Sequence, residues 1–100
     1  MDKVLLYNNL FDIYENTLTE NKKELFVLYY KENLSMQEIA DEKKVSKAFV
    51  GKVIKEVEKK LEQLERDFKL LKIKDRLNYI MTINDINTIK SLIKDVNDII

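Results

Sequence analysis

The sequence contains no proline and a single glycine, Gly51, so almost no residue in it interrupts an α-helix. Apolar residues recur three and four positions apart along most of the chain, with lysine, glutamate and asparagine between them, which is the period of an amphipathic helix. One hundred residues suit one domain with a modest core. The sequence therefore predicts an all-α fold.

Two short helices joined by a tight turn are predicted between Leu34 and Lys55. Ser35 and Glu38 have the spacing of a capping box, in which the serine hydroxyl accepts a hydrogen bond from a free backbone N–H of the first helix. This helix reaches about Glu42, and Ser46 caps the second helix. The residues expected to face inward are Met36, Ile39 and Ala40 in the first helix, Val45 as an apolar plug in the turn, and Val50, Val53, Ile54 and Val57 in the second. The pattern is typical of a helix-turn-helix motif, whose second helix enters the major groove of DNA, although an ordinary helical hairpin would show it too.

Lysines gather on the outward face of the second helix of this motif. Residues 43–60 contain seven lysines and two glutamates, a local charge of +5, whereas residues 35–42 sum to −3. A concentrated basic stripe is the electrostatic footprint of a surface that binds phosphate groups. We therefore expect Lys47, Lys52 and Lys55 to contact nucleic acid. The full set of candidate residues is Lys43, Lys44, Ser46, Lys47, Ala48, Gly51, Lys52, Lys55 and Lys59.

The composition argues against catalysis. The chain has no histidine, which is the usual general base and neutral metal ligand, and no cysteine to form a disulfide or a thiolate site. Gly51 alone cannot make a glycine-rich phosphate loop. We expect no enzymatic activity, no metal and no cofactor. The 18 basic and 18 acidic residues also balance, so any affinity for DNA is expected to be local and modest.

The beginning of the chain does not have the pattern of a secretory signal. The short apolar run after Lys3 is broken by Asn8 and Asn9, and no stretch approaches the about 20 apolar residues of a membrane span. We therefore expect a cytoplasmic protein with no membrane partner.

Two amphipathic helices are predicted before the motif, one from about Lys3 to Glu15 and one from Thr19, as its N-cap, to about Lys31. The second contains adjacent aromatic residues, Tyr29 and Tyr30, which in another setting could stack on nucleic-acid bases. Aromatic residues at this spacing on an amphipathic helix usually pack against neighbouring helices instead, and we expect these to belong to the core.

A heptad pattern continues beyond the motif. The apolar positions alternate between spacings of four and three, and they are Val50, Ile54, Val57, Leu61, Leu64, Phe68 and Leu71. The second helix of the motif should therefore extend as a stalk. A last helix, capped by Thr82 or Asn84, repeats the spacing with Ile86, Ile89, Ile93, Val96 and Ile100. Either this helix folds back on the stalk or the stalks of two chains pair, and so much apolar surface favours a homodimer that presents two motifs to DNA.

Several short motifs follow one another in a consistent order over about residues 5–66. They are Leu10-Phe11-Asp12-Ile13-Tyr14, Leu18-Thr19-Glu20, Leu28-Tyr29-Tyr30, Leu34-Ser35, Glu38-Ile39-Ala40-Asp41-Glu42 and Val45-Ser46. In these motifs the chain resembles the YlxM family, small bacterial helix-turn-helix proteins similar to region 4 of sigma factors. The resemblance implies an all-helical DNA-binding fold. It also implies a link to the signal recognition particle pathway, because the family is associated with genes for the targeting GTPase and its receptor.

The sequence departs from the family at the start of the recognition helix. The family usually has an arginine and a glutamine after the capping serine, where this chain has Lys47 and Ala48. Arginine can bind guanine through two hydrogen bonds, whereas lysine is a flexible point charge and alanine offers only a methyl contact. Gly51 stands at an exposed helical position, at a cost of ~1 kcal/mol relative to alanine, and Phe49, where the family has a small residue, is expected to pack against the first helices. We expect weak sequence specificity.

Two functions follow from these observations. In the first, residues 1–66 form a helix-turn-helix DNA-binding domain and residues 67–100 a helical stalk that extends the same domain and mediates dimerisation. The core would have three to four helices, winged-helix-like or similar to sigma region 4, and the protein would bind duplex DNA as a regulator associated with the targeting pathway. In the second, the fold has lost DNA binding and docks the targeting GTPase, its receptor or the particle's RNA.

Overall fold

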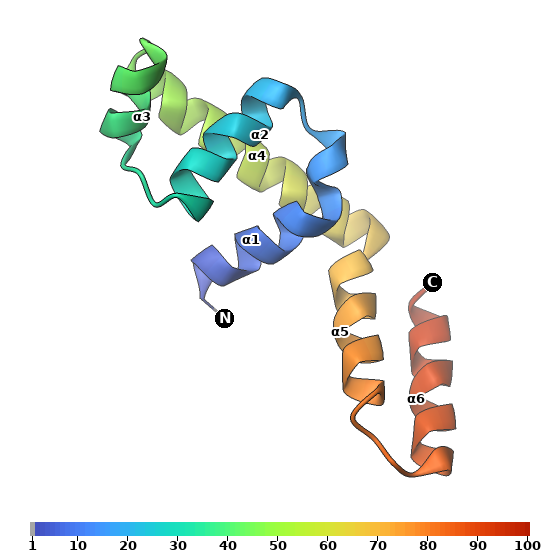
Figure 1. The fold of residues 1–100 in the computed structure, drawn as a ribbon. Helices are drawn as coiled ribbons and strands as arrows, with labels where there is room; N and C mark the ends of the chain where they lie inside the picture. Colours follow the sequence, from blue (N-terminus) through green and yellow to red (C-terminus); the bar gives the residue numbers. More distant parts are fainter. Residues whose placement is uncertain (1) are drawn as a thin grey trace. The chain divides into compact units, whose positions relative to one another are not determined.

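The computed structural model describes residues 2–100, and all of the regular structure in this range is helical. The elements are α1 (Lys3–Tyr14), the 3₁₀ turn η1 (Glu15–Thr17), α2 (Glu20–Phe26), the π-helical turn η2 (Val27–Lys31), α3 (Met36–Lys43), α4 (Lys47–Phe68), α5 (Leu70–Ile80) and α6 (Ile86–Ile99) (Figure 1). The predicted all-α fold is confirmed. The described residues divide into two compact units between Leu64 and Glu65, so α4 contributes to both.

The first unit is built on the apolar face of α4 and on an aromatic cluster from α1, α2 and η2. On α4 the buried residues are Val50, Val53, Ile54, Val57 and Leu61. The ring of Phe11 stacks on that of Phe26 with centroids 4.3 Å apart, and Phe26 stacks on Tyr30 at 4.7 Å. Full burial of each such side chain stabilises the fold by about 1.5–3 kcal/mol. Tyr30 is 8% exposed, which confirms its predicted place in the core, and Tyr29 is half-buried with its ring edge-on to Tyr30.

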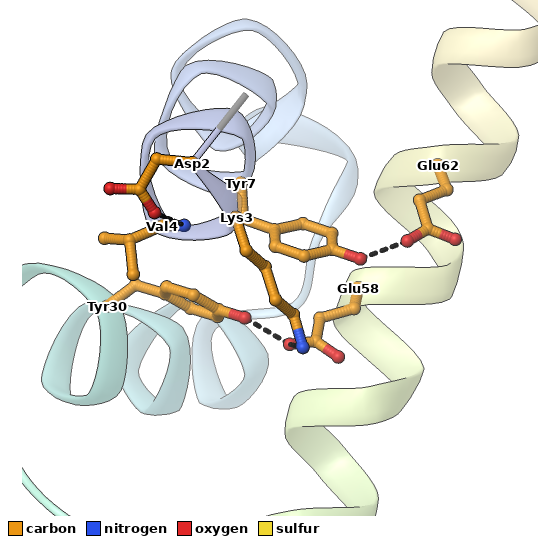
Figure 2. Close-up of polar contacts among 7 residues, drawn as sticks. All are labelled: Asp2, Lys3, Val4, Tyr7, Tyr30, Glu58 and Glu62. Carbon is orange, nitrogen blue, oxygen red and sulfur yellow. Dashed lines mark hydrogen bonds and ion pairs between the residues drawn. The ribbon is translucent and has the colours of Figure 1, made fainter.

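Polar contacts fix α4 against the helices that precede it. The phenol of Tyr7 in α1 donates a hydrogen bond to Glu62, and the phenol of Tyr30 donates one to Glu58 (Figure 2). The ammonium group of Lys3 lies 4.0 Å from the Glu58 carboxylate. Buried or half-buried polar groups need such partners, because an unpaired one costs about 1–3 kcal/mol. These bonds fix the rotation of α4 about its own axis, with Glu58 and Glu62 facing α1 and η2.

The predicted continuous stalk is interrupted. Helix α4 ends at Phe68, Lys69 adopts a left-handed conformation with φ 57°, and α5 begins at Leu70. The carboxylate of Glu65 accepts hydrogen bonds from the backbone N–H groups of Leu71, at 3.0 Å, and Lys72, at 3.1 Å. It thereby supplies partners for free N–H groups in the first turn of α5, which offsets the loss of helical hydrogen bonds at the break. The heptad pattern carried no sign of this break, because neither glycine nor proline marks it.

The second unit contains a hairpin of two helices. Helix α6 folds back and packs against α5, so the last helix has an intramolecular partner (Figure 1). Pairing between two chains stays a prediction. The N-cap of α6 is Asp85, whose side chain accepts a hydrogen bond from the Thr88 backbone at 2.8 Å, so the predicted caps Thr82 and Asn84 were wrong. Only three apolar side chains of the hairpin are buried, namely Leu71, Ile80 and Val96. A hairpin of this size has little core of its own.

The tyrosine–glutamate contacts give the stability of the first unit a defined pH dependence. Burial raises the pKa of Tyr7 and of Tyr30 well above the ordinary phenol value, and the hydrogen bond to Glu62 or Glu58 raises it further. A group whose pKa is higher in the folded chain contributes its full stability below the unfolded pKa, about 10 for tyrosine. That contribution is lost as the pH rises, because the unfolded chain releases the proton first.

Raising the pH from about 8 to about 10.5 should therefore lower the free energy of unfolding by about 1 kcal/mol for each of the two phenols. The measurement is urea unfolding followed by circular dichroism at both pH values. Lysines and the remaining tyrosines contribute to the pH dependence as well, so the double variant Tyr7→Phe/Tyr30→Phe is the control. This variant should lose about 2 kcal/mol less than the original chain over the same interval. Equal losses of unfolding free energy in the two proteins would contradict the assignment of this pH dependence to Tyr7 and Tyr30.

Candidate nucleic-acid interface

Helices α3 and α4 form the helix-turn-helix unit that the sequence predicted. The Ser35 hydroxyl accepts a hydrogen bond from the Glu38 backbone N–H, and the Glu38 carboxylate accepts one from the Ser35 N–H, both at 3.0 Å. Both bonds of the predicted capping box are therefore present. In the turn, the N–H of Val45 bonds to the Ala40 carbonyl at 3.0 Å. The Ser46 hydroxyl then accepts a hydrogen bond from the Phe49 N–H at 3.0 Å and starts α4.

The turn between α3 and α4 places a lysine in an unusual conformation. Lys44 has φ 58° and ψ 45°, the left-handed region in which glycine is the usual residue. Its side chain is exposed beside the start of α4. Val45, the predicted apolar plug, is 39% exposed, so that prediction was wrong.

Five of the candidate lysines form one exposed set, which we call the lysine face. Its members are Lys44, Lys47, Lys52, Lys55 and Lys59, all of them exposed. Lys52, Lys55 and Lys59 are three and four residues apart, so they lie on one side of α4, opposite its buried valines and isoleucine. Within residues 2–100, no carboxylate forms an ion pair with any of the five.

Lys43 does not belong to this face. Its side chain is half-buried and donates a hydrogen bond to the Glu24 carboxylate of α2. The contact joins α2 to α3, so Lys43 has a structural partner that the sequence could not reveal.

The acidic side chains of α4 are engaged elsewhere. The Glu56 carboxylate lies 3.8 Å from the ammonium group of Lys22, and Glu58 and Glu62 accept the phenol hydrogen bonds already described. The three carboxylates therefore have partners other than the lysine face, although they lie only three or four residues from its lysines along the helix.

The remaining candidates are small residues between the lysines. Ala48 is exposed and Gly51 is half-buried. A Cβ atom added at Gly51 would lie 3.5 Å from the Met36 sulfur, which is ordinary van der Waals contact, and Gly51 has no positive φ. Nothing inside the first unit therefore requires glycine at this position.

The expectation that Phe49 packs against the first helices was wrong, because its side chain is 42% exposed. Phe49 directly precedes Val50, which is fully buried. Successive helical residues point about 100° apart, so a residue next to the centre of the buried stripe lies at its edge. The heptad thus indicated that Phe49 lies at the edge of the stripe, but not how far the neighbouring helices cover that edge.

No group of three or more acidic residues in the described part of the chain could hold a metal ion, and no helix there is long and apolar enough to cross a membrane.

Comparisons with known proteins give the chain clear relatives. The sequence profile of the UPF0122 family, described as "Putative helix-turn-helix protein, YlxM / p13 like", matches residues 1–99. The match thus includes residues 67–99, for which the short sequence motifs gave no correspondence. The description of the family thus agrees with the helix-turn-helix unit formed by α3 and α4.

Individual relatives differ in how much of their length the chain covers. The UPF0122 protein YlxM of Bacillus subtilis (strain 168) is 42% identical over 72 residues, which is 72% of this chain and 66% of that protein. A UPF0122 protein of Shouchella clausii (strain KSM-K16) is 42% identical over 71 residues, and the chain covers 65% of its length, or less than two thirds. A probable UPF0122 protein of Mycoplasma mycoides is 36% identical over 102 residues, which is 100% of this chain and 90% of that protein.

Replacing Gly51 by alanine should raise the free energy of unfolding by about 1 kcal/mol, because alanine is the better helix former and the added methyl group meets no steric obstacle. Urea unfolding measures the change. The opposite replacement on the same helix, Ala48→Gly, should lower the stability and serves as the control. An unchanged or reduced stability of the Gly51→Ala variant would mean that the fold itself needs this glycine.

Proposed function

The chain belongs to the UPF0122 family of helix-turn-helix proteins, and we propose that it binds duplex DNA with α4 as the recognition helix. The observation that carries the proposal is the lysine face, in which Lys44, Lys47, Lys52, Lys55 and Lys59 are exposed on or beside α4 without an ion pair in residues 2–100. Unpaired cations on a recognition helix attract phosphate groups, whose bound counterions are released on binding. The α4 N-terminus and the Ser46 hydroxyl at its cap add a favourable site for a phosphate.

The chemistry of the face also sets the kind of binding. Lysine contributes a point charge, and the start of α4 offers no arginine, asparagine or glutamine for paired hydrogen bonds to a base. Phosphate contacts should therefore provide most of the affinity, and sequence specificity should be weak.

The hairpin of α5 and α6 supports a homodimer as part of the proposal. It leaves apolar side chains on both helices in contact with solvent, among them Leu77 (46% exposed), Ile86 (60%) and Ile93 (51%). An exposed apolar surface of this kind is typical of an interface between protein chains. Two chains joined through their hairpins would carry two helix-turn-helix units to the same DNA.

The role in the cell is the part of the proposal that rests on family resemblance. The resemblance to the YlxM family implies a link to the signal recognition particle pathway, and we infer a cytoplasmic regulator associated with that pathway. The alternative is a protein that docks the targeting GTPase, its receptor or the particle's RNA. The neutral net charge and the apolar hairpin favour the alternative, whereas the lysine face favours DNA. Titrations with duplex DNA and with structured RNA at the same salt concentration would separate the two.

The DNA proposal predicts that replacing Lys52 and Lys55 together by alanine weakens binding about tenfold or more at about 0.1 M salt, because two phosphate contacts are lost. Fluorescence anisotropy with a labelled mixed-sequence duplex, repeated over a series of salt concentrations, measures this loss. The slope of log affinity against log salt concentration should become shallower by about 2.

The matched control removes the same charge from α6. Lys90 and Lys94 are exposed there, and the double variant Lys90→Ala/Lys94→Ala should retain its affinity within about twofold if phosphate contacts are confined to the lysine face. Equal losses in the two double variants would show attraction to net charge alone. Absence of salt-dependent binding by the original protein would rule out the DNA proposal.

The homodimer proposal predicts that the double variant Leu77→Glu/Ile93→Glu is monomeric, because carboxylates cannot be buried in an apolar interface without a large loss of solvation. Size-exclusion chromatography with light scattering should give the mass of two chains for the original protein and of one for the variant. The control is Asn78→Glu/Asn97→Glu, which adds the same charge at exposed polar positions of the same two helices and should remain dimeric. A monomeric original protein would overturn the proposal.

A further inference from the structure

The exposed surface at the start of α4 contains an apolar group among the lysines. Val45 and Phe49 are 39% and 42% exposed, and Ala48 is exposed as well. We call these three residues the apolar tip. All of them lie within three residues of Ser46, whose hydroxyl caps α4. The exposed part of these side chains contributes nothing to the stability of the fold, and its burial against a partner would favour binding.

The lysines beside the tip restrict what that partner can be. Lys44 is adjacent to Val45 in the chain, Lys47 is adjacent to Ala48, and Lys52 is one helical turn beyond Ala48. All three ammonium groups are exposed and have no ion pair in the part of the chain that the structure describes. The partner should therefore present an apolar group flanked by negative charges.

Duplex DNA contains one such group. The C5-methyl of thymine projects into the major groove, between the two rows of phosphates, and alanine and phenylalanine side chains are among those that contact it. In a helix-turn-helix protein, the residues at the N-terminal end of the recognition helix are the ones that reach base edges. Ala48 and Phe49 occupy that end of α4.

The other means of reading a base are scarce in the same region. Residues 44–62 include no asparagine or glutamine, the side chains that bind adenine through two hydrogen bonds, and no arginine. The three glutamates that could accept from cytosine are held by Lys22, Tyr30 and Tyr7. Apolar contact is thus the base-reading chemistry that this surface offers beside its lysines.

We propose that the apolar tip recognises the C5-methyl group of pyrimidines in the major groove, so that the protein prefers sites rich in thymine. The inference rests on the proposed DNA binding and adds to it a specificity determined by Ala48 and Phe49. The lysine face holds the phosphates, and the tip distinguishes a methylated from an unmethylated pyrimidine.

The test uses one mixed-sequence duplex prepared in three forms. In the first form the DNA is unmodified. In the second, deoxyuridine replaces every thymidine, and in the third, 5-methylcytosine replaces every cytosine, so the methyl group alone is removed or added. Fluorescence anisotropy at one low salt concentration should show the affinity falling in the order third, first, second. The expected change is about fourfold for each methyl group that is buried against the tip, and the salt dependence should be the same for all three forms.

Two variants assign the effect to the tip. In Phe49→Ser and Ala48→Ser the ratio of affinities for the thymine and deoxyuridine duplexes should move toward one, while thermal unfolding confirms that each variant is folded. The control is Phe68→Ser, which makes the same change at an exposed phenylalanine at the other end of α4 and should leave the ratio unchanged.

The outcomes separate the inference from the function on which it rests. Binding of all three duplexes with equal affinity would overturn methyl recognition and leave the DNA proposal standing. A preference for methylated duplexes that persists in Phe49→Ser and Ala48→Ser would also overturn the assignment to the tip. Failure of all three duplexes to bind would overturn the proposed function.

Discussion

The hydrogen bonds from Tyr7 to Glu62 and from Tyr30 to Glu58 engage two carboxylates of α4 and join this helix to the segments before it. A half-buried carboxylate is stable only where a donor is available, and the two phenols provide donors on the side of α1 and η2. With Glu58 and Glu62 engaged by the phenols, the lysine face has no ion pair within residues 2–100. A chain with no net charge thus has a local set of unpaired lysines, because carboxylates of the same helix have other partners.

The two units of the chain differ in how many apolar side chains they bury. In the first, aromatic stacking and buried aliphatic residues surround α4, and several helices share one core. In the second, two helices contact each other, bury three apolar side chains and leave several others exposed. The first has the core that a domain needs to present a surface, whereas the second buries few side chains of its own.

Local signals predicted much of the fold, because they depend on residues close together in the sequence. Ser35 and Glu38 form the capping box, Thr19 accepts a hydrogen bond from the Lys22 N–H, and the helical period identified the buried face of α4. Some predictions were incomplete where distant parts of the chain decide the outcome, and others were wrong at local features, such as the cap of α6. The contact of Lys43 with Glu24 requires α2 and α3 to be adjacent, and no residue type announces the left-handed Lys69 that ends α4.

The predictions for the candidate site also separate into those that local sequence could make and those that it could not. The spacing of three and four residues correctly placed Lys52, Lys55 and Lys59 on one exposed side of α4, since it follows from helix geometry alone. The exposure of Phe49 depends on how much of the edge of the buried stripe the neighbouring helices cover. Helical period alone does not fix that coverage.

The left-handed conformation of Lys44 has a consequence for how this turn can change during evolution. Any residue with a Cβ atom is strained there, by roughly 1–2 kcal/mol, so glycine would relieve the backbone while deleting an ammonium group beside α4. Greater thermal stability and a stronger attraction to polyanions therefore favour different residues at position 44. Selection for one property at this turn is made at the expense of the other.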